Sequence, residues 1–166
     1  EKGRKLEVIT EDSITGLEAV CHMQFYDGIS VVRSWTEVTN RGEEAQGLEY
    51  VSSFSLNGID KEGLRPFDEK MELSIPHNAW QKELCWQTYT LGELGLSVSQ
   101  PEIMHRSSKT IGIGNTGNWS TKEYIPMGYL CNTETNSSLF WQIEHNGSWY
   151  WEISDQDGHV YLKLSG

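Results

Sequence analysis

The chain has 166 residues, 37% hydrophobic and 22% charged, a composition typical of a folded domain with a sizeable core and not of a disordered segment. Its net charge of -11 disfavours nucleic acid as a partner, because an acidic surface repels a phosphate backbone, whereas neutral polymers such as sugars remain compatible with it. No apolar run approaches the roughly 20 residues that a membrane helix needs, so we expect no membrane partner.

The first strand signal is an alternation of apolar and polar residues over 17–26, which predicts a strand with one buried face. Asp27-Gly28 follows as a tight turn, since both residues tolerate positive φ, and residues 30–40 form the return strand. A further strand is expected over 50–56, stopped by Asn57-Gly58.

The middle of the chain predicts two strands and two loops. Residues 58–70 are polar and broken by Gly and Pro, which indicates a loop. Met71, Leu73 and Ile75 predict a short strand that Pro76 ends, and residues 84–91 predict the next strand. Residues 105–120 are rich in Gly, Ser, Thr and Asn, and should form a long loop.

The last third predicts a meander of four strands over 124–132, 139–145, 148–154 and 159–165, with turns at 132–136, Asn146-Gly147 and 157–158. No window shows a helical stripe of useful length. The sequence therefore predicts an all-β fold, an antiparallel β-sandwich of the supersandwich type, forming a single domain over residues 1–166. The abrupt start at Glu1 predicts that this domain is a fragment of a longer, multidomain enzyme.

The aromatic residues after Asn146-Gly147 are the most conspicuous part of the chain. A hairpin turn there would place Trp149, Trp151 and Ile153 on one face, with Trp141 and Ile143 as cross-strand partners. The main interpretation is a core layer; a sugar-stacking platform and an interface with another domain are the alternatives. Trp80 follows Pro76 among polar residues, and both a core anchor and a ligand-facing or interface ring are open for it.

Catalytic and metal motifs are not found. The Gly-rich stretch 112–118 lacks the Lys-Ser/Thr ending of a P-loop, and five scattered His residues have no zinc spacing, so we expect neither a metal nor another cofactor. The carboxylates are interpreted as surface charges, which leaves no catalytic residue in this chain. Cys21, Cys85 and Cys131 are widely spaced and odd in number, which predicts reduced, buried thiols and a cytoplasmic location.

Residues 120–153, STKEYIPMGYLCNTETNSSLFWQIEHNGSWYWEI, resemble the N-terminal domain of family 36 glycoside hydrolases, the microbial α-galactosidases. A Ser-containing segment leads into a Pro-containing strand, an F-x-Q-I-E strand follows, and then a turn with N-G-S-W. Residues 14–44 are similar to the family's paired strands, and residues 75–86, IPHNAWQKELCW, are similar to its G-x-W-x-x-E/R stretch. The resemblance covers about 150 residues.

The resemblance implies a large β-supersandwich ahead of a catalytic (β/α)₈ barrel. The barrel carries the two Asp residues that act on terminal α-galactose with retention of configuration, and neither belongs to this chain. The family domain has more upstream strands, so this chain can also be only the later part of a larger sandwich. A tryptophan of the family domain lines the galactose pocket, and Trp80 occupies the matching position.

Three hypotheses follow for function. The first is a non-catalytic domain of an α-galactosidase-like enzyme, whose partners are an α-galactoside substrate, the catalytic barrel of the same chain and further copies in a homo-oligomer. The second is a free-standing carbohydrate-binding module that uses Trp80, Trp119 or the Trp149/Trp151 face. The third is a purely structural interaction domain. Binding of sugar by the chain alone separates the second from the others.

Overall fold

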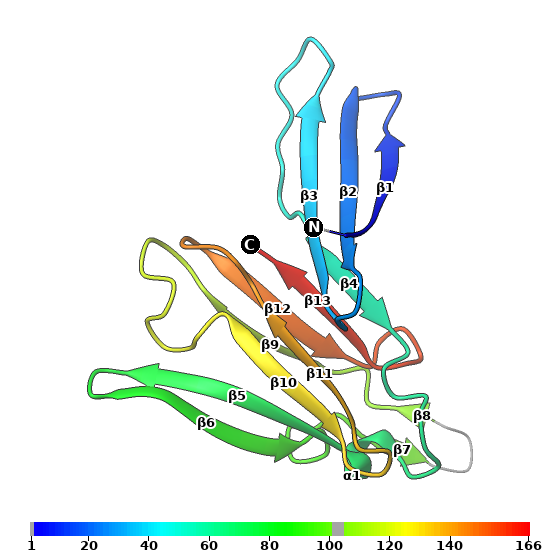
Figure 1. Ribbon diagram of the computed structural model, residues 1–166, viewed down its shortest axis with the longest axis vertical. Coiled ribbons are helices and arrows are strands. Elements are labelled where there is room, and N and C mark those ends of the chain that lie inside the picture. Colours follow the sequence, from blue (N-terminus) through cyan, green and yellow to red (C-terminus); the bar gives the residue numbers. More distant parts are fainter. Residues whose placement is uncertain (1, 101–104) are drawn as a thin grey trace. The chain divides into compact units, whose positions relative to one another are not determined.

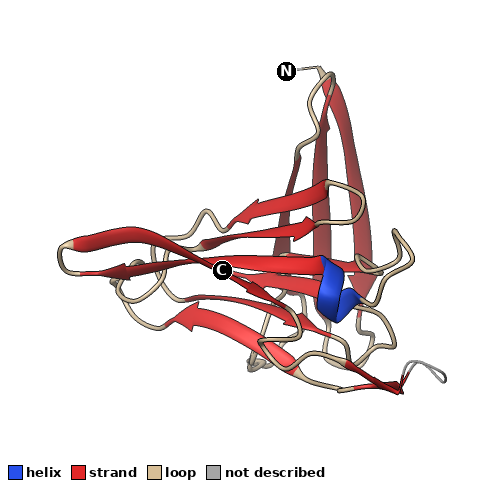
Figure 2. Cartoon of the chain, turned by 90° about the horizontal axis from the view of Figure 1, so that it is seen from below, coloured by secondary structure: helices blue, strands red, loops and turns tan. Residues whose placement is uncertain are grey.

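The computed structural model describes residues 2–100 and 105–166, and strands make up nearly all of their regular structure. Figure 2 shows these strands with a single short helix in the described part, α1 (Phe67–Lys70), which lies in the segment predicted as a loop. The all-β, antiparallel fold class is thus confirmed. The chain divides into two compact units, Glu1–Phe54 and Ser55–Gly166, and the single domain over 1–166 stays a prediction.

The first unit is a three-stranded antiparallel sheet in the order β1-β2-β3. Its strands are β1 (Gly3–Glu11), β2 (Leu17–Tyr26) and β3 (Val32–Asn40). The predicted Asp27-Gly28 turn joins β2 to β3, and Gly28 has a φ of 82°, in the region that favours glycine. Strand β1 is not predicted by the sequence, because all of its residues are exposed and no buried face marks it.

Strand β4 (Phe54–Asn57) is shorter than the strand predicted over 50–56. The backbone just before it is engaged by side chains. The Thr36 hydroxyl donates to the Ser52 carbonyl at 2.8 Å, and the Ser34 hydroxyl donates to the Ser53 carbonyl at 2.6 Å. Side-chain hydrogen bonds of this kind satisfy a carbonyl without a ladder, so the preceding residues stay irregular.

The second unit contains two four-stranded sheets, with strand orders β11-β10-β5-β6 and β4-β13-β12-β9 (Figure 1). The short pair β7 (Val98–Gln100) and β8 (His105–Arg106) lies outside them. The remaining strands are β5 (Met71–Ala79), β6 (Lys82–Thr90), β9 (Thr110–Asn115), β10 (Met127–Asn132), β11 (Ser137–Gln142), β12 (Trp149–Ser154) and β13 (Tyr161–Ser165).

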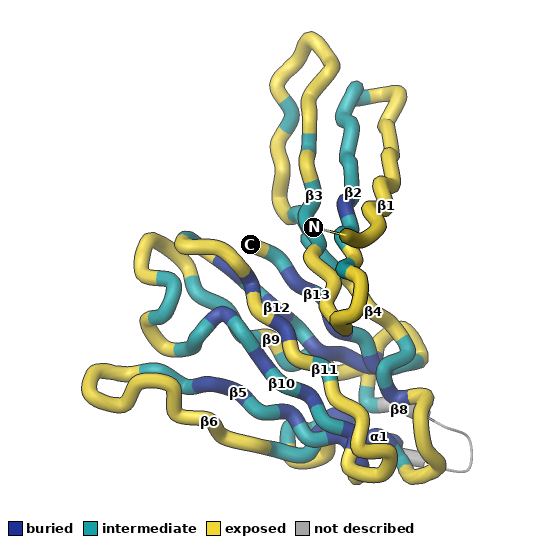
Figure 3. Tube along the Cα trace, viewed as in Figure 1, coloured by how far each residue is buried: buried dark blue, intermediate teal, exposed yellow. Residues whose placement is uncertain are grey.

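The core of this unit is the layer between the two sheets. Alternate side chains of β5, β10, β12 and β13 are buried, which gives these strands their dark segments in Figure 3. Trp141 of one sheet meets Trp151 of the other edge to face, with ring centroids 5.3 Å apart and an interplanar angle of 80°. Such tilted pairs stabilise a core beyond the area that they bury. The second unit is therefore a β-sandwich.

The prediction that Asn146-Gly147 closes a hairpin is wrong. Strand β11 pairs with β10, whereas β12 pairs with β9 and β13, so the segment 143–148 carries the chain from one sheet to the other. Trp141 and Trp151 therefore meet across the sandwich and not side by side on one sheet. An apolar strand face is buried more completely by a facing sheet than by the neighbouring strand alone.

Strand β5 also continues through Pro76, although the sequence predicts that the proline ends it. The Pro76 carbonyl accepts a hydrogen bond from the Ile125 N–H at 3.1 Å, and the nitrogen of a strand residue faces the same edge as its carbonyl. On that edge the β10 ladder already stops at the Tyr129–Ser74 pair. The missing N–H of Pro76 therefore costs the sheet no ladder bond.

The predicted loop over 105–120 contains strand β9, and two of its glycines, Gly112 and Gly114, are strand residues. A Cβ at Gly112 would lie 1.9 Å from the Tyr150 hydroxyl oxygen, and one at Gly114 would lie 3.0 Å from the same ring. The two glycines make room for the Tyr150 side chain, which covers the strand. The buried thiols are a further correction, since Cys85 is exposed and Cys21 and Cys131 are half-buried.

Gly128 is expected to tolerate no larger residue. A Cβ there would lie 2.2 Å from the indole of its cross-strand partner Trp141, which is 5% exposed and packed against Trp151. Gly128→Ala should lower the free energy of unfolding by about 1–3 kcal/mol in chemical denaturation, because the ring has nowhere to move.

Gly47→Ala is the matched control, since a Cβ at Gly47 meets nothing within 4 Å and its φ is not in the left-handed region. It should change stability by less than about 0.5 kcal/mol. Equal unfolding midpoints for the two variants would contradict the role given to Gly128.

Candidate functional site

Trp80 lies at the tip of the β5–β6 hairpin, which projects beyond β10 in Figure 1. Ala79 pairs with Lys82, so Trp80 and Gln81 form a two-residue turn, and Gln81 takes the positive φ of 63° that closes it. The Trp80 side chain is 86% exposed. Of the two alternatives left open by the sequence, the core anchor is therefore excluded and the exposed ring holds.

The base of this hairpin is held by one amide side chain, that of Asn78. Its Nδ2 donates to the Thr121 carbonyl, and its Oδ1 accepts the Leu84 N–H at 3.1 Å. Its backbone N–H also donates to the Glu123 carbonyl at 2.8 Å. Asn78 thus ties both strands of the hairpin and the segment 121–123 together, and the exposed Trp80 is carried on a braced turn.

A bulge in β6 adds to this local order. Between the His77–Cys85 and Ala79–Lys82 pairs, β6 has one more residue than β5, and Leu84 takes a φ of 55°. The Asn78 Oδ1 bond is made to the N–H of Leu84 itself, so the side chain stabilises the unusual backbone at the bulge. Bulges of this kind re-aim the end of a strand pair and recur near functional sites.

The other predicted aromatic residues separate into two groups. Trp119 is 60% exposed and precedes the segment that Asn78 binds, while Asn115 donates to its carbonyl at 2.7 Å. Trp149 and Trp151 are 3% and 0% exposed, and Trp149 donates its indole N–H to the Ser120 carbonyl at 2.6 Å. The core interpretation of Trp149 and Trp151 holds, and both the sugar platform and the interface are wrong for these two rings.

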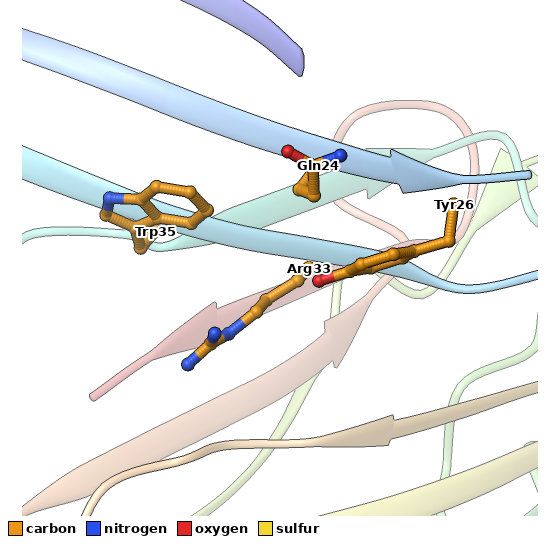
Figure 4. A pocket seen from close by; sticks show the side chains of 4 residues that line it. All are labelled: Gln24, Tyr26, Arg33 and Trp35. Atoms are coloured by element: carbon orange, nitrogen blue, oxygen red, sulfur yellow. The ribbon is translucent and has the colours of Figure 1, made fainter. Parts of the chain in front are cut away.

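A groove on the first unit is a feature that sequence reasoning misses. Figure 4 shows it between Trp35 at one end and Tyr26 at the other, with Gln24 and Arg33 between the rings. The four side chains come from β2 and β3, and Gln24 and Arg33 are direct cross-strand partners. Both rings are half-buried, so each keeps a face or an edge in solvent. Because side chains alternate along a strand, the even positions of β2 and the odd positions of β3 lie on the same face of the sheet.

Hydrogen bonds lower the pKa of four acidic groups, so none of these four has the raised pKa of a general acid. The Lys5 hydrogen bond and charge lower the pKa of Glu7, the Thr15 hydroxyl lowers that of Asp12, and Arg41 lowers that of Glu18. The Leu64 and Arg65 N–H groups do the same for Glu134. The general acid of a glycosidase needs the opposite, a raised pKa that keeps it protonated near neutral pH.

Two further searches concern metals and membranes. Within residues 2–100 and 105–166, no three His, Cys, Asp or Glu side chains are grouped so that they could hold a metal ion. In the same part of the chain, no helix has the length and apolar character to cross a bilayer.

The sequence matches no protein-family model and no curated protein. Solved structures do resemble it: three are crystal structures of the GH36 alpha-galactosidase AgaA from Geobacillus stearothermophilus, in complex with raffinose, with stachyose and with 1-deoxygalactonojirimycin. Each superposes with a TM-score of 0.68 at 16% identity, over 96% of this chain and 20% of AgaA. The resemblance to family 36 is thereby confirmed at the level of the fold, and the chain spans about a fifth of AgaA's length.

Proposed function

We propose that this chain is a non-catalytic β-sandwich domain of an α-galactosidase-like glycoside hydrolase. The observation that carries the proposal is the exposed Trp80 on its braced hairpin turn, at the position that resembles the pocket tryptophan of family 36. The likeness of the fold to a segment of AgaA supports it, since that segment is a small part of a larger enzyme.

In this proposal the Trp80 indole forms one wall of the galactose pocket. An aromatic face packs against the C–H groups of a sugar and excludes water beside it. The two carboxylates that act on the glycosidic bond belong to the catalytic barrel of the same protein, and the sandwich supports that barrel and the contacts of a homo-oligomer. The substrate is an α-galactoside, and the chain's contribution to its turnover is the placement of one ring.

Removing that ring tests the proposal. In the full-length enzyme, Trp80→Ala should lower kcat/KM for an α-galactoside about tenfold or more, because a stacking contact worth about 1–3 kcal/mol is lost at roughly 1.4 kcal/mol per tenfold. The measurement is steady-state hydrolysis of raffinose by wild type and variant. Trp80→Phe keeps an aromatic face and should recover part of the loss.

Trp119→Ala is the matched control, because Trp119 is the other highly exposed tryptophan of the second unit that sequence reasoning selects and does not occupy the matching position. It should leave kcat/KM within about twofold, which is less than 0.5 kcal/mol. Unchanged kinetics in Trp80→Ala, or equal losses in both variants, would overturn the pocket-wall role.

A further inference from the structure

The groove between Trp35 and Tyr26 is an open depression of small-ligand size on one face of the sheet. Its lining residues project from one face, because Gln24 and Tyr26 are two apart on β2 while Arg33 and Trp35 are two apart on β3. The space between them is about 380 Å³, near the lower end of the roughly 300–1,000 Å³ of small-molecule sites. This size favours a few linked rings over a macromolecular partner.

The Trp35 ring is fixed in place before any ligand arrives. It stacks on the buried His22 ring at 4.7 Å and 17°, and its indole N–H donates to Glu37 Oε1 at 3.2 Å. The Lys5 ammonium lies 5.1 Å from the ring centroid. A side chain held on several sides loses little conformational entropy when a ligand binds, so a ligand that makes few contacts can still bind.

Gln24 is fixed as well. Its Nε2 donates to the Arg4 carbonyl at 3.3 Å and to the Phe25 carbonyl at 2.9 Å. These two acceptors orient the amide so that its oxygen lies on the Trp35 side, as Figure 4 shows. The groove therefore presents a carbonyl acceptor from Gln24 and the N–H donors of Arg33 between two aromatic rings.

The charges around the groove compensate one another. Lys5 pairs with Glu7 at 2.7 Å, and the two ring nitrogens of His22 lie 3.2 Å from Glu7 and 3.4 Å from Glu37. The bond to Lys5 lowers the pKa of Glu7, so this carboxylate stays ionised and offsets the lysine at neutral pH. With Arg33 of the lining included, the cations Lys5 and Arg33 are matched by the carboxylates of Glu7 and Glu37. A groove with aromatic walls, hydrogen-bonding groups and little net charge suits a neutral polar ligand better than an anion.

We propose that this groove binds one or two hexose units of a neutral oligosaccharide, with Trp35 and Tyr26 against the C–H faces of the sugar and with Gln24 and Arg33 on its hydroxyl groups. The site lies wholly within β2 and β3 and shares no residue with Trp80. It is therefore independent of the proposed pocket-wall role, and either can fail without the other. In a galactosidase it would hold an oligosaccharide in addition to the one in the galactose pocket.

The test is an NMR titration of the ¹⁵N-labelled chain with raffinose, stachyose and maltotriose, followed at the tryptophan indole N–H signals. The Trp35 signal, assigned by its absence in Trp35→Phe, should shift in a saturable way with at least one sugar. Arg33→Ala should weaken that binding about tenfold, since it removes hydrogen bonds worth about 1.4 kcal/mol. Tyr26→Ala should weaken it similarly and does not disturb the Trp35–His22 stack.

Trp80→Ala is the matched control and should leave the titration of the Trp35 signal unchanged. The proposal is overturned if no sugar shifts the Trp35 signal, or if Arg33→Ala and Tyr26→Ala both bind as the wild type does. Shifts at Trp35 that follow protein concentration without sugar would instead identify self-association through this face and would also overturn it. Shifts confined to the Trp80 or Trp119 signals would place sugar binding elsewhere.

Discussion

Replacing Trp151 with alanine is expected to lower the free energy of unfolding by about 3–5 kcal/mol, the typical cost of truncating a large buried aromatic side chain. Trp151 is fully buried, and its ring packs edge to face against Trp141 of the opposite sheet. The variant loses the transfer energy of the indole and leaves a cavity between the two sheets. Chemical denaturation followed by far-ultraviolet circular dichroism measures the loss.

Trp80→Ala is a control of the same chemistry in the same unit, because it removes an identical side chain that is 86% exposed. It should change the free energy of unfolding by well under about 1 kcal/mol. The difference between the two variants is the expected result. Similar losses in both, or a small loss in Trp151→Ala, would show that the central layer of the sandwich is not where the structure places it.

Asp155→Ala should destabilise the second unit by at least about 2 kcal/mol. The carboxylate is 1% exposed and accepts hydrogen bonds from the Ser107 N–H at 3.1 Å, the Ser107 hydroxyl at 2.7 Å and the Lys109 N–H at 2.8 Å. Without it, two backbone N–H groups lose a charged acceptor, at about 1–3 kcal/mol each. The shift of the unfolding midpoint in urea gives the value.

Asp157→Ala is the neighbouring control, since Asp157 is an exposed residue of the β12–β13 turn. Asp157→Ala should change the free energy of unfolding by less than about 0.5 kcal/mol. Asp155→Asn keeps the shape and one acceptor oxygen, so its stability should fall between those of the wild type and Asp155→Ala. Equal midpoints for the two alanine variants would contradict the role of Asp155 as the anchor of residues 107–109.

Local patterns predict much of the strand content. The alternation over 17–26 and the Asp27-Gly28 turn predict β2 and its hairpin with β3, and the turns at 132–136 and 157–158 predict the β10–β11 and β12–β13 hairpins. Each of these features lies within about ten consecutive residues. Turn chemistry and side-chain period act over that distance, so they can be recognised without the rest of the fold.

The partition of strands between sheets cannot be predicted in this way. Asn146-Gly147 has the composition of a hairpin turn, yet β12 takes β9 as a partner from more than 30 residues upstream. The choice depends on how completely two apolar faces bury each other, which is a property of the whole unit. The loop prediction for the glycines of β9 is wrong for the same reason. Only the position of the Tyr150 side chain, from a neighbouring strand, explains why glycine occupies these strand positions.

The two candidate sites also differ in whether local sequence patterns or the assembled sheet reveal them. The polar neighbours of Trp80 leave a core anchor and an exposed ring open, and the structure shows the exposed ring, while its role in a galactose pocket stays a prediction. The groove of Tyr26 and Trp35 needs the register of β2 against β3 before its residues come together. A two-residue turn at Asp27-Gly28 would pair Gln24 with Val31, whereas the longer connection pairs Gln24 with Arg33, so the turn alone does not predict this register.

In the β5–β6 hairpin, the residue that holds the backbone in place and the residue exposed at the tip are different. Asn78 supplies the bonds to both strands and to the segment 121–123, whereas the side chain at position 80 adds no packing. Substitutions at position 80 should therefore leave the stability of the second unit nearly unchanged, whereas substitutions at Asn78 should lower it. A change of side chain at the tip can therefore alter what this hairpin contacts without unfolding the sheet that carries it.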